Sequence, residues 1–192
     1  MQQFTENAIM EHFEQMLREM PFDKITVTAL ARHCEISPNT FYYHFSDIYD
    51  LLDHWLVRML EPYVKSSEQQ WQASVKQLLH RLKKEKKLVY HLFNSISRDR
   101  LEWQVFGGTY DVFYANLSAR PESRCVSEEE LHTLADYCCY AFLGFFLRFL
   151  WNQMDADVDS EVDRLSALTE PFVHQTLCAY AKMSEDAQKE DK

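Results

Sequence analysis

The stretch Ile36–Phe45 gathers polar and aromatic side chains that could contact a nucleic acid. Ser37 before Pro38 is a helix-start signal, because serine caps free backbone N–H groups and proline suits the first helical position. In such a helix Phe41 and Phe45 share one face and would anchor it to a core. The side chains expected to point away from that core are Asn39, Thr40, Tyr42, Tyr43 and His44. These donors, acceptors and stacking groups are ones that a DNA major groove can accept.

Other chemistries lack a comparable set of residues. The eight histidines show neither HExxH nor zinc-finger spacing, and with three glycines in the chain a glycine-rich phosphate loop is excluded. Asp50 and His54 are four residues apart, but they make only a two-ligand set. The five cysteines contain no CxxC pair and are expected to be buried thiols, with redox sensing by adjacent Cys138 and Cys139 as the alternative. We therefore expect no metal, no cofactor and no enzymatic activity.

Composition favours helices joined by short turns. The chain has 192 residues, is 46% hydrophobic, and contains only 3 glycines and 5 prolines. No apolar run approaches the length of roughly 18–20 residues that a membrane span needs, and Glu6, Glu11 and Glu14 interrupt any signal-peptide pattern. These features predict a soluble cytoplasmic protein that does not contact a membrane.

The charge balance is unfavourable for a DNA-binding protein. The net charge is −10, and residues 1–55 carry three basic against nine acidic side chains, a local net charge of −6. Contacts to DNA must then come from a few well-placed groups instead of a basic field. A cluster of four lysines within residues 83–87 could touch a nucleic-acid backbone, although a solvated helix end is the simpler explanation.

The elements that would position Ile36–Phe45 are four short helices. Residues 5–19 repeat apolar side chains at helical spacing up to Pro21, and Thr26 or Thr28 can cap a second helix. A turn of about three residues leads to Ser37, which gives the helix-turn-helix pattern. Asp47 then caps a strongly apolar fourth helix that runs toward Pro62.

Three motifs in this region resemble the N-terminal domain of TetR/AcrR-type transcriptional regulators over about residues 5–55. They are Phe22-x-x-Ile25-Thr26-Val27-x-x-Leu30-Ala31, Ile36-Ser37-x-x-Thr40-Phe41-Tyr42-Tyr43-His44-Phe45 and Asp47-x-x-x-Leu51-Leu52. The resemblance implies that the third helix contacts DNA through Ser37, Pro38, Asn39, Thr40, Tyr42, Tyr43 and His44. Thr26 and Thr28, at the start of the second helix, are candidates for phosphate contacts.

Two positions depart from the pattern of that family. Many members have glycine where this chain has Glu35, and many have lysine near Ser46. Glu35 would strain the turn if the position needs a positive φ, and the missing lysine removes a phosphate anchor. Both departures reduce the expected DNA affinity and leave the expected fold unchanged.

The second half of the chain predicts a larger helical bundle. Helical patterns cover residues 66–84, 87–97, 101–117 and 128–153, followed by a last segment from Val162. Gly107-Gly108 predicts a kink or a close contact, and Pro171 predicts a kink or a new helix. Ser127 with Glu130 forms a capping box for the helix 128–153, which is apolar almost all round and must be covered on more than one side.

This half resembles the regulatory domain of the dihydroxyacetone-kinase regulator branch of TetR proteins. The motifs are Lys86-Lys87-Leu88-Val89, Phe93-Asn94-Ser95, Leu101-Glu102 and Ala141-x-x-Gly144. The resemblance to TetR-type proteins implies a pocket for a small-molecule effector in this half. Aromatic walls with a few polar groups suit such a pocket, and this criterion selects the candidates. Candidate lining residues are Trp55, Met59, Tyr63, Tyr90, His91, Asn94, Trp103, Tyr110 and Phe146. The alternative is that these aromatic residues form ordinary core.

Together these observations predict an all-α regulator with two domains. Residues 1–46 form the DNA-binding helix-turn-helix domain, residues 47–183 form the regulatory and dimerisation domain with 47–62 as a linking helix, and residues 184–192 form a flexible tail. The resemblance implies a homodimer on a near-palindromic double-stranded operator, controlled by an effector or a protein partner that tilts the fourth helix. The alternative is a co-regulator that acts through protein contacts and binds DNA weakly or not at all, which the local charge of −6 favours.

Overall fold

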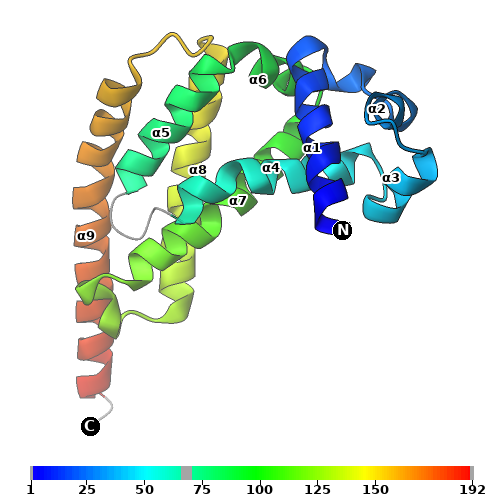
Figure 1. Cartoon of the computed structure of the whole chain (residues 1–192). Coiled ribbons are helices and arrows are strands. Elements are labelled where there is room, and N and C mark those ends of the chain that lie inside the picture. The colour runs from blue at the N-terminus through cyan, green and yellow to red at the C-terminus, as the bar shows by residue number, and fades with distance from the viewer. Residues whose placement is uncertain (1, 66–70, 191–192) are drawn as a thin grey trace. The chain divides into compact units, whose positions relative to one another are not determined.

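The computed structural model describes the backbone of residues 2–65 and 71–190, with the side chains of residues 4–63 and 71–184. Helices account for all of its regular structure, and the described residues contain no strand (Figure 1). The expected all-α fold class is therefore confirmed. The elements are α1 (Gln2–Glu19), η1 (Phe22–Lys24), α2 (Val27–His33), α3 (Pro38–His44), α4 (Ile48–Lys65), α5 (Trp71–Lys84), α6 (Lys86–Phe93), α7 (Arg98–Ser118), η2 (Pro121–Cys125), α8 (Glu128–Trp151) and α9 (Val158–Glu190).

Packing divides the chain into two compact units. Unit 1 comprises Met1–Glu61 and Arg81–Gln104, and unit 2 comprises Pro62–His80 and Val105–Lys192. The segment 81–104, which the sequence predicts to be part of the regulatory domain, thus groups with the N-terminal helices. The functional boundary at residue 46 stays a prediction, because compactness and function need not divide a chain at the same point.

The core of unit 1 forms around α1. Phe13 and Leu17 of α1 are fully buried together with Leu30 of α2 and Phe41 of α3. The helix α6 also packs on α1. Glu85, the residue before α6, accepts hydrogen bonds from Arg18 of α1 at 3.0 and 3.2 Å. The helix-turn-helix elements are therefore fixed to a scaffold that includes residues from well beyond the N-terminal 55.

Unit 2 has a separate core between α8 and α9. Leu134 and Cys138 of α8 pack in one cluster with Val173 and Leu177 of α9. The predicted capping box at the start of α8 is present, since Ser127 and Glu130 each accept a hydrogen bond from the backbone of the other. The short element η2 packs along α9.

Two expected interruptions of helices do not end them. The helix α7 passes through Gly107-Gly108 without a break, and α9 passes through Pro171 as a single helix, which excludes a new helix starting there. A Cβ placed on Gly107 would meet no heavy atom within 4 Å among the described residues, so the expected close contact is absent at that glycine. The helix α9 continues to Glu190, whereas a flexible tail is predicted from residue 184; residues 191–192 of that prediction lie outside the described residues.

Candidate nucleic-acid interface and effector pocket

Two side-chain caps define where α2 and α3 begin. Thr26 is the N-cap of α2 and its hydroxyl accepts a hydrogen bond from the backbone N–H of Ala29 at 3.2 Å. Ser37 is the N-cap of α3 and accepts from the backbone N–H of Thr40 at 3.0 Å, with Pro38 in the first turn. Each cap satisfies a backbone donor that a helix start would otherwise leave free. The sequence offers Thr26 or Thr28 as the N-cap of α2, and the structure shows that the cap is Thr26.

The turn between α2 and α3 forces one residue into a left-handed conformation. Glu35 has a φ of 57°, and the backbone N–H of Ile36 returns to the carbonyl oxygen of Ala31 at 2.9 Å. This pattern reverses the chain at the end of α2, and glycine adopts the required φ without a steric cost. The position therefore has the backbone conformation for which glycine is suited, but this chain supplies a glutamate.

The helix α3 has one buried and one exposed face. Phe41 and Phe45 are 0% and 2% exposed, and their ring centroids lie 5.7 Å apart within the core of unit 1. On the other face Tyr42 and Tyr43 are 56% and 72% exposed, although large aromatic side chains usually bury most of their surface. The structure thus places the two phenol hydroxyls where an external partner can reach them.

The remaining candidates on this surface differ in their accessibility. Ser37, Pro38 and Asn39 at the start of α3 are exposed, as are Thr26 and Thr28 at the start of α2. Thr40 is half-buried, and its hydroxyl lies 2.9 Å from the hydroxyl of Ser37.

His44 does not point outward, and that expectation is wrong. Its side chain is 5% exposed, and its Nδ1 lies 3.2 Å from Oε1 of Glu6 on α1. The reason is a contact with α1, where Glu6 supplies a carboxylate partner for the imidazole. His44 can support the surface of α3 from behind, but its ring does not reach a groove directly.

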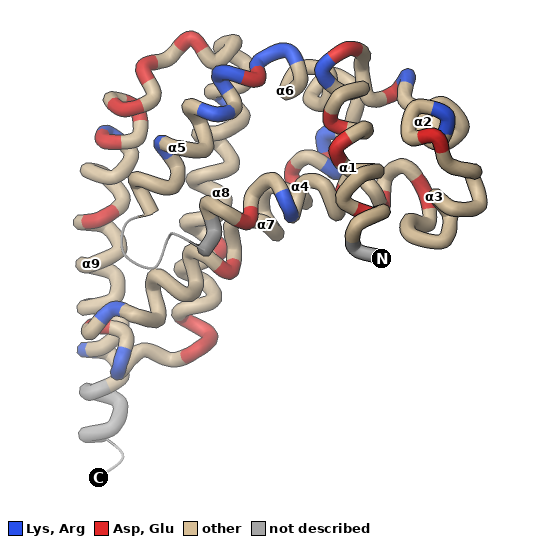
Figure 2. Tube along the Cα trace, viewed as in Figure 1, with Lys and Arg blue, Asp and Glu red and all other residues tan. Residues whose placement is uncertain are grey.

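The electrostatics of this surface depend on uncharged groups. The helix α3 contains no lysine, arginine, aspartate or glutamate, and acidic residues occur along α1 and at the start of α4 (Figure 2). Ser46, which stands where relatives of this type often have lysine, donates from its backbone N–H and its hydroxyl to Oδ2 of Asp50. The backbone hydrogen bond from Ser46 lowers the pKa of Asp50 below its usual range, so this carboxylate stays charged at neutral pH.

The nine predicted effector residues are not gathered in one cavity. Trp55 is 4% exposed in the core of unit 1, where its indole N–H donates to Glu14. His91 donates from Nδ1 to the carbonyl oxygen of Leu17 at 2.6 Å, so His91 is engaged in a half-buried contact while Asn94 lies at an exposed helix end. Trp103 is 77% exposed. Met59 and Tyr90 are half-buried residues of unit 1.

The other three predicted residues belong to unit 2, and two of them pack in aromatic stacks. Tyr110 stacks on Phe106 and Tyr114, and its hydroxyl forms a hydrogen bond with His132. Phe146 stacks on Phe142 of the same helix, and Tyr63 is half-buried. These contacts fit the alternative interpretation, in which aromatic residues at helical spacing form ordinary core.

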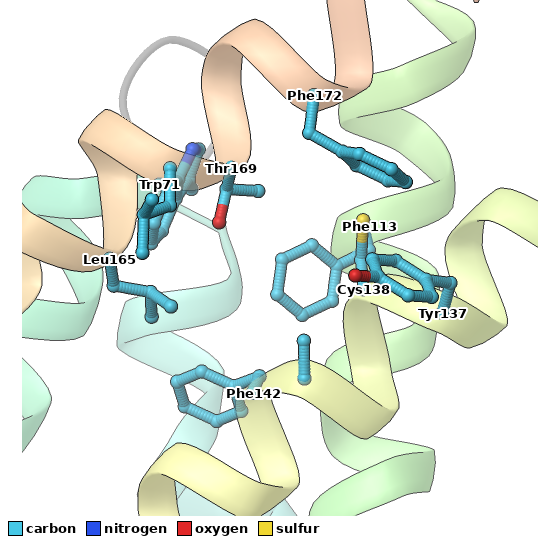
Figure 3. Close-up of a pocket in the computed structure, with 10 residues that line it drawn as sticks. Trp71, Phe113, Tyr137, Cys138, Phe142, Leu165, Thr169 and Phe172 are labelled. Carbon is cyan, nitrogen blue, oxygen red and sulfur yellow. The ribbon is translucent and has the colours of Figure 1, made fainter. Parts of the chain in front are cut away.

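Unit 2 instead contains an apolar cavity of about 210 Å³. Figure 3 shows aromatic rings from α7, α8 and α9, together with Trp71, arranged around a common space. None of the nine predicted residues lines it. Its walls are formed by Trp71, Phe113, Tyr137, Cys138, Ala141, Phe142, Leu165, Leu168, Thr169 and Phe172.

Few polar groups face this cavity. The side chain of Thr169 lines this space (Figure 3). No hydrogen bond of its hydroxyl is found among the described residues. Burial raises the pKa of the Cys138 thiol to about 11, so this wall stays neutral at physiological pH. Such a cavity fits an uncharged, mainly apolar ligand that offers one hydrogen-bonding group.

A charged network fixes the Trp71 wall from outside. The indole N–H of Trp71 donates to Oε1 of Glu170 at 2.8 Å, and Arg120 binds the other carboxylate oxygen at 2.8 Å. Burial alone would raise the pKa of Glu170, but the hydrogen bonds from Trp71 and Arg120 outweigh it and lower that pKa. Glu170 therefore remains ionised and orients the indole ring.

The sequence carried only a weak signal for this cavity. Phe113, Phe142 and Phe172 stand in three different helices, and their spacing along the chain does not show that they converge. Trp71 follows residues 66–70, which lie outside the described part of the chain. A lone polar residue on an apolar face, such as Thr169 between Leu165 and Val173, was the one feature that could have indicated an oriented ligand.

A metal centre and a membrane span are the remaining kinds of site to consider. Among the described residues, no group of three or more histidine, cysteine, aspartate or glutamate side chains could hold a metal ion. Within the same part of the chain α8 is long and apolar enough to cross a membrane, but 56% of its apolar stretch is buried inside the protein, as in the core helix of a bundle.

Comparisons with known proteins agree with this architecture. The family model for the tetR family of bacterial regulatory proteins matches residues 9–54, and a TetR-type model for a transcriptional regulator C-terminal region matches residues 69–171. No curated protein matches the sequence. Similar solved structures include the dihydroxyacetone kinase operon activator DhaS, with a TM-score of 0.66 and 14% identity over 88% of this chain and 96% of that one.

Two repressors are also among the similar structures, and at these identities the likeness concerns the fold. AlkX from Dietzia sp. strain DQ12-45-1b, implicated in biodegradation of n-alkanes, has a TM-score of 0.58 and 13% identity over 88% of this chain and 97% of that one. NalD, the secondary repressor of the MexAB-OprM multidrug efflux pump in Pseudomonas aeruginosa, has a TM-score of 0.56 and 16% identity over 88% and 95%. With both family models in sequence order on a matching fold, the chain belongs to the TetR family of transcriptional regulators and is not an enzyme.

Proposed function

We propose that this TetR-family protein is a cytoplasmic regulator that binds a near-palindromic operator as a homodimer under the control of a small molecule. The observation that carries the DNA-binding part is the division of α3 into two faces. Phe41 and Phe45 fix the helix to the core, while Tyr42 and Tyr43 remain 56% and 72% exposed. A helix held from behind with polar groups in front is the arrangement that enters a major groove.

The chemistry of the surface determines how DNA would be bound. The hydroxyls of Thr26, Thr28 and Tyr43 can donate to phosphate oxygens, and Asn39 can pair with the edge of an adenine. None of these contacts needs a positive charge, which suits a region with a net charge of −6. Two copies of α3 would occupy successive major grooves about 34 Å apart.

The homodimer would form through α8 and α9. Both helices expose large apolar side chains, among them Tyr140 at 64%, Trp151 at 59% and Leu168 at 75%. Gly144 adds an independent argument, because a Cβ at this position would meet no heavy atom within 4 Å in the described residues. Glycine inside a helix costs about 1 kcal/mol relative to alanine, and nothing near Gly144 in the described part of the chain requires it. The close approach of a second chain would require it.

The control element would be the apolar cavity of unit 2. The helix α4 contributes residues to both units, so a ligand that shifts α4 would change the spacing between the two copies of α3. The dihydroxyacetone-kinase regulator branch, which the sequence motifs resemble, is part of this proposal, and the structural similarity to DhaS fits it.

Fluorescence anisotropy with DNA from upstream of the chain's own gene tests the DNA-binding proposal. We expect salt-sensitive, sequence-selective binding by the dimer. Absence of binding at low salt, with the dimer intact by sedimentation, would contradict the proposal. That result would favour the alternative, a co-regulator that acts through protein contacts, which the acidic character of residues 1–55 supports.

A further inference from the structure

The mouth of the unit 2 cavity lies on the surface formed by α8 and α9. Four of the residues that line the cavity are exposed, namely Tyr137 and Ala141 of α8 and Leu168 and Phe172 of α9. The rings of Tyr137 and Phe172 form one edge of the mouth, with their centroids 4.8 Å apart. Leu168 is 75% exposed, so its apolar surface lies in solvent in the isolated chain.

The same side chains belong to the surface on which dimerisation is proposed. Along α8 the exposed positions Tyr137, Ala141, Gly144, Arg148 and Trp151 follow each other at intervals of four, three, four and three residues. That spacing keeps one face of a helix against a partner helix. The cavity mouth is therefore continuous with the helix face that a second copy would cover.

This face is complementary to itself about Gly144. If two copies of α8 cross in opposite directions at Gly144, Tyr137 lies opposite Trp151 and Tyr140 lies opposite Arg148. Such a crossing pairs two aromatic rings and places a guanidinium near a tyrosine ring, which is a favourable cation–π arrangement. The missing side chain at position 144 allows the two backbones to approach at the crossing point.

We propose that the second copy closes this cavity, so that a small uncharged aromatic ligand binds well only in the dimer. The inference rests on the proposed homodimer and adds the ligand class and its linkage to assembly. Walls from Trp71, Phe113 and Phe142 and a volume of about 210 Å³ suit a ligand of one or two rings; an apolar cavity of about 150 Å³ binds benzene. The free hydroxyl of Thr169 selects a ligand with one donor, while a polyhydroxylated ligand would leave its other hydroxyls unpaired.

Indole is a suitable probe, because it is apolar, uncharged and carries a single N–H donor. Calorimetry of the full chain should show binding of one indole per protomer, and glycerol should not bind. Sedimentation equilibrium should show that saturating indole strengthens the dimer. If closure by the partner improves indole affinity tenfold, two sites per dimer give a dimer about a hundredfold tighter.

Gly144→Arg separates the two parts of the argument. The variant lies outside the cavity lining, gains helix propensity and should be a folded monomer by circular dichroism and sedimentation. We expect its indole affinity to fall at least tenfold. Ala167→Arg adds the same charge at an exposed position of α9 that neither lines the cavity nor lies on the apolar face, and it should remain a dimer with unchanged indole affinity.

The outcomes distinguish the inference from the proposed function. A monomeric Gly144→Arg variant that binds indole as tightly as the parent would overturn partner closure and leave the homodimer intact. A variant that stays dimeric would overturn the proposed dimer surface and the closure together. Thr169→Val should weaken indole binding severalfold without changing dimerisation, and unchanged affinity, or no indole binding by the parent, would refute the assigned ligand class.

Discussion

Tyr43 offers the most direct test of DNA contact at the level of single residues. Its side chain is 72% exposed on α3, so Tyr43→Ala removes a phenol without opening the core. We expect a loss of about 1–2 kcal/mol in specific DNA binding, the size of one phosphate or base-edge contact, measured by anisotropy. Thermal stability and dimerisation should not change. The control Val57→Ala truncates a side chain that is 68% exposed on α4, and it should change neither DNA binding nor thermal stability. A collapse in thermal stability of Tyr43→Ala would show instead that the ring is a structural residue.

Glu35 affects stability and DNA binding through different physical effects. Its φ of 57° is costly for any residue with a Cβ, so Glu35→Gly should raise the free energy of unfolding by roughly 0.5–1 kcal/mol after the added flexibility of the unfolded chain is subtracted. Chemical denaturation measures this gain. Glu35→Gln keeps the strained backbone and should leave stability nearly unchanged. Both variants remove a negative charge beside α3 and should therefore strengthen DNA binding, and equal stabilities of the two variants would contradict the argument from φ.

Single residues also show how far the sequence could predict the site. The exposed positions Tyr42 and Tyr43 follow from the spacing of Phe41 and Phe45 within one helix, because local geometry decides them. His44 does not, because its burial depends on Glu6 of α1, 38 residues away along the chain. The prediction of the effector residues was wrong for the same reason. Rings from four helices converge on the cavity, and this convergence leaves no pattern within any one helix.

At the level of elements, the N-cap of α3 links local stability to DNA binding. Ser37 accepts a hydrogen bond from the backbone of Thr40, and Ser37→Ala should cost about 1 kcal/mol of stability as measured by denaturation. Ser37→Asp can still cap the helix, so stability should be retained, but its charge at the DNA surface should weaken operator binding. If Ser37→Asp lost as much stability as Ser37→Ala, the cap would not be the cause.

The contact between α1 and α6 should make stability depend on acid pH. The side-chain hydrogen bond from Arg18, followed by its charge, lowers the pKa of Glu85 below its ordinary value of 4.5. A lowered folded-state pKa means that the contribution is complete above pH 4.5 and is lost as the pH falls through the folded-state value. Thermal melts between neutral pH and pH 3 should therefore show a smaller loss for Glu85→Gln than for the parent. Parallel curves for the two proteins would exclude this contact as a source of acid sensitivity.

Helix ends could largely be predicted, and the grouping of helices could not. Thr26, Ser37 and Asp47 signal helix starts because a cap acts on backbone groups two or three residues away. The continuation of α9 through Pro171 and the packing of α6 on α1 depend on partners distant in sequence, such as Glu85 for Arg18. The low helix propensity of proline costs about 3 kcal/mol at one position, and the burial of a whole helix face outweighs it. Which face is buried depends on contacts that exist only in the folded chain.

For the whole molecule, the charge distribution predicts how DNA binding depends on salt. Within residues 1–55 Arg18 is bound to Glu14 and Glu85 and Lys24 lies 3.3 Å from Asp23, whereas no ion pair of Arg32 is found in the described part of the chain. With one or two available cations per protomer, a dimer should show a slope of log K against log salt concentration of about −2 to −4. Arg32→Gln should reduce the magnitude of that slope by about 2, because each protomer loses a cation that is available to neutralise a phosphate, while Arg164→Gln on α9 should leave it unchanged. A parent slope nearer −8 would show that cations beyond residue 55, such as the lysines of residues 83–87, also neutralise phosphates.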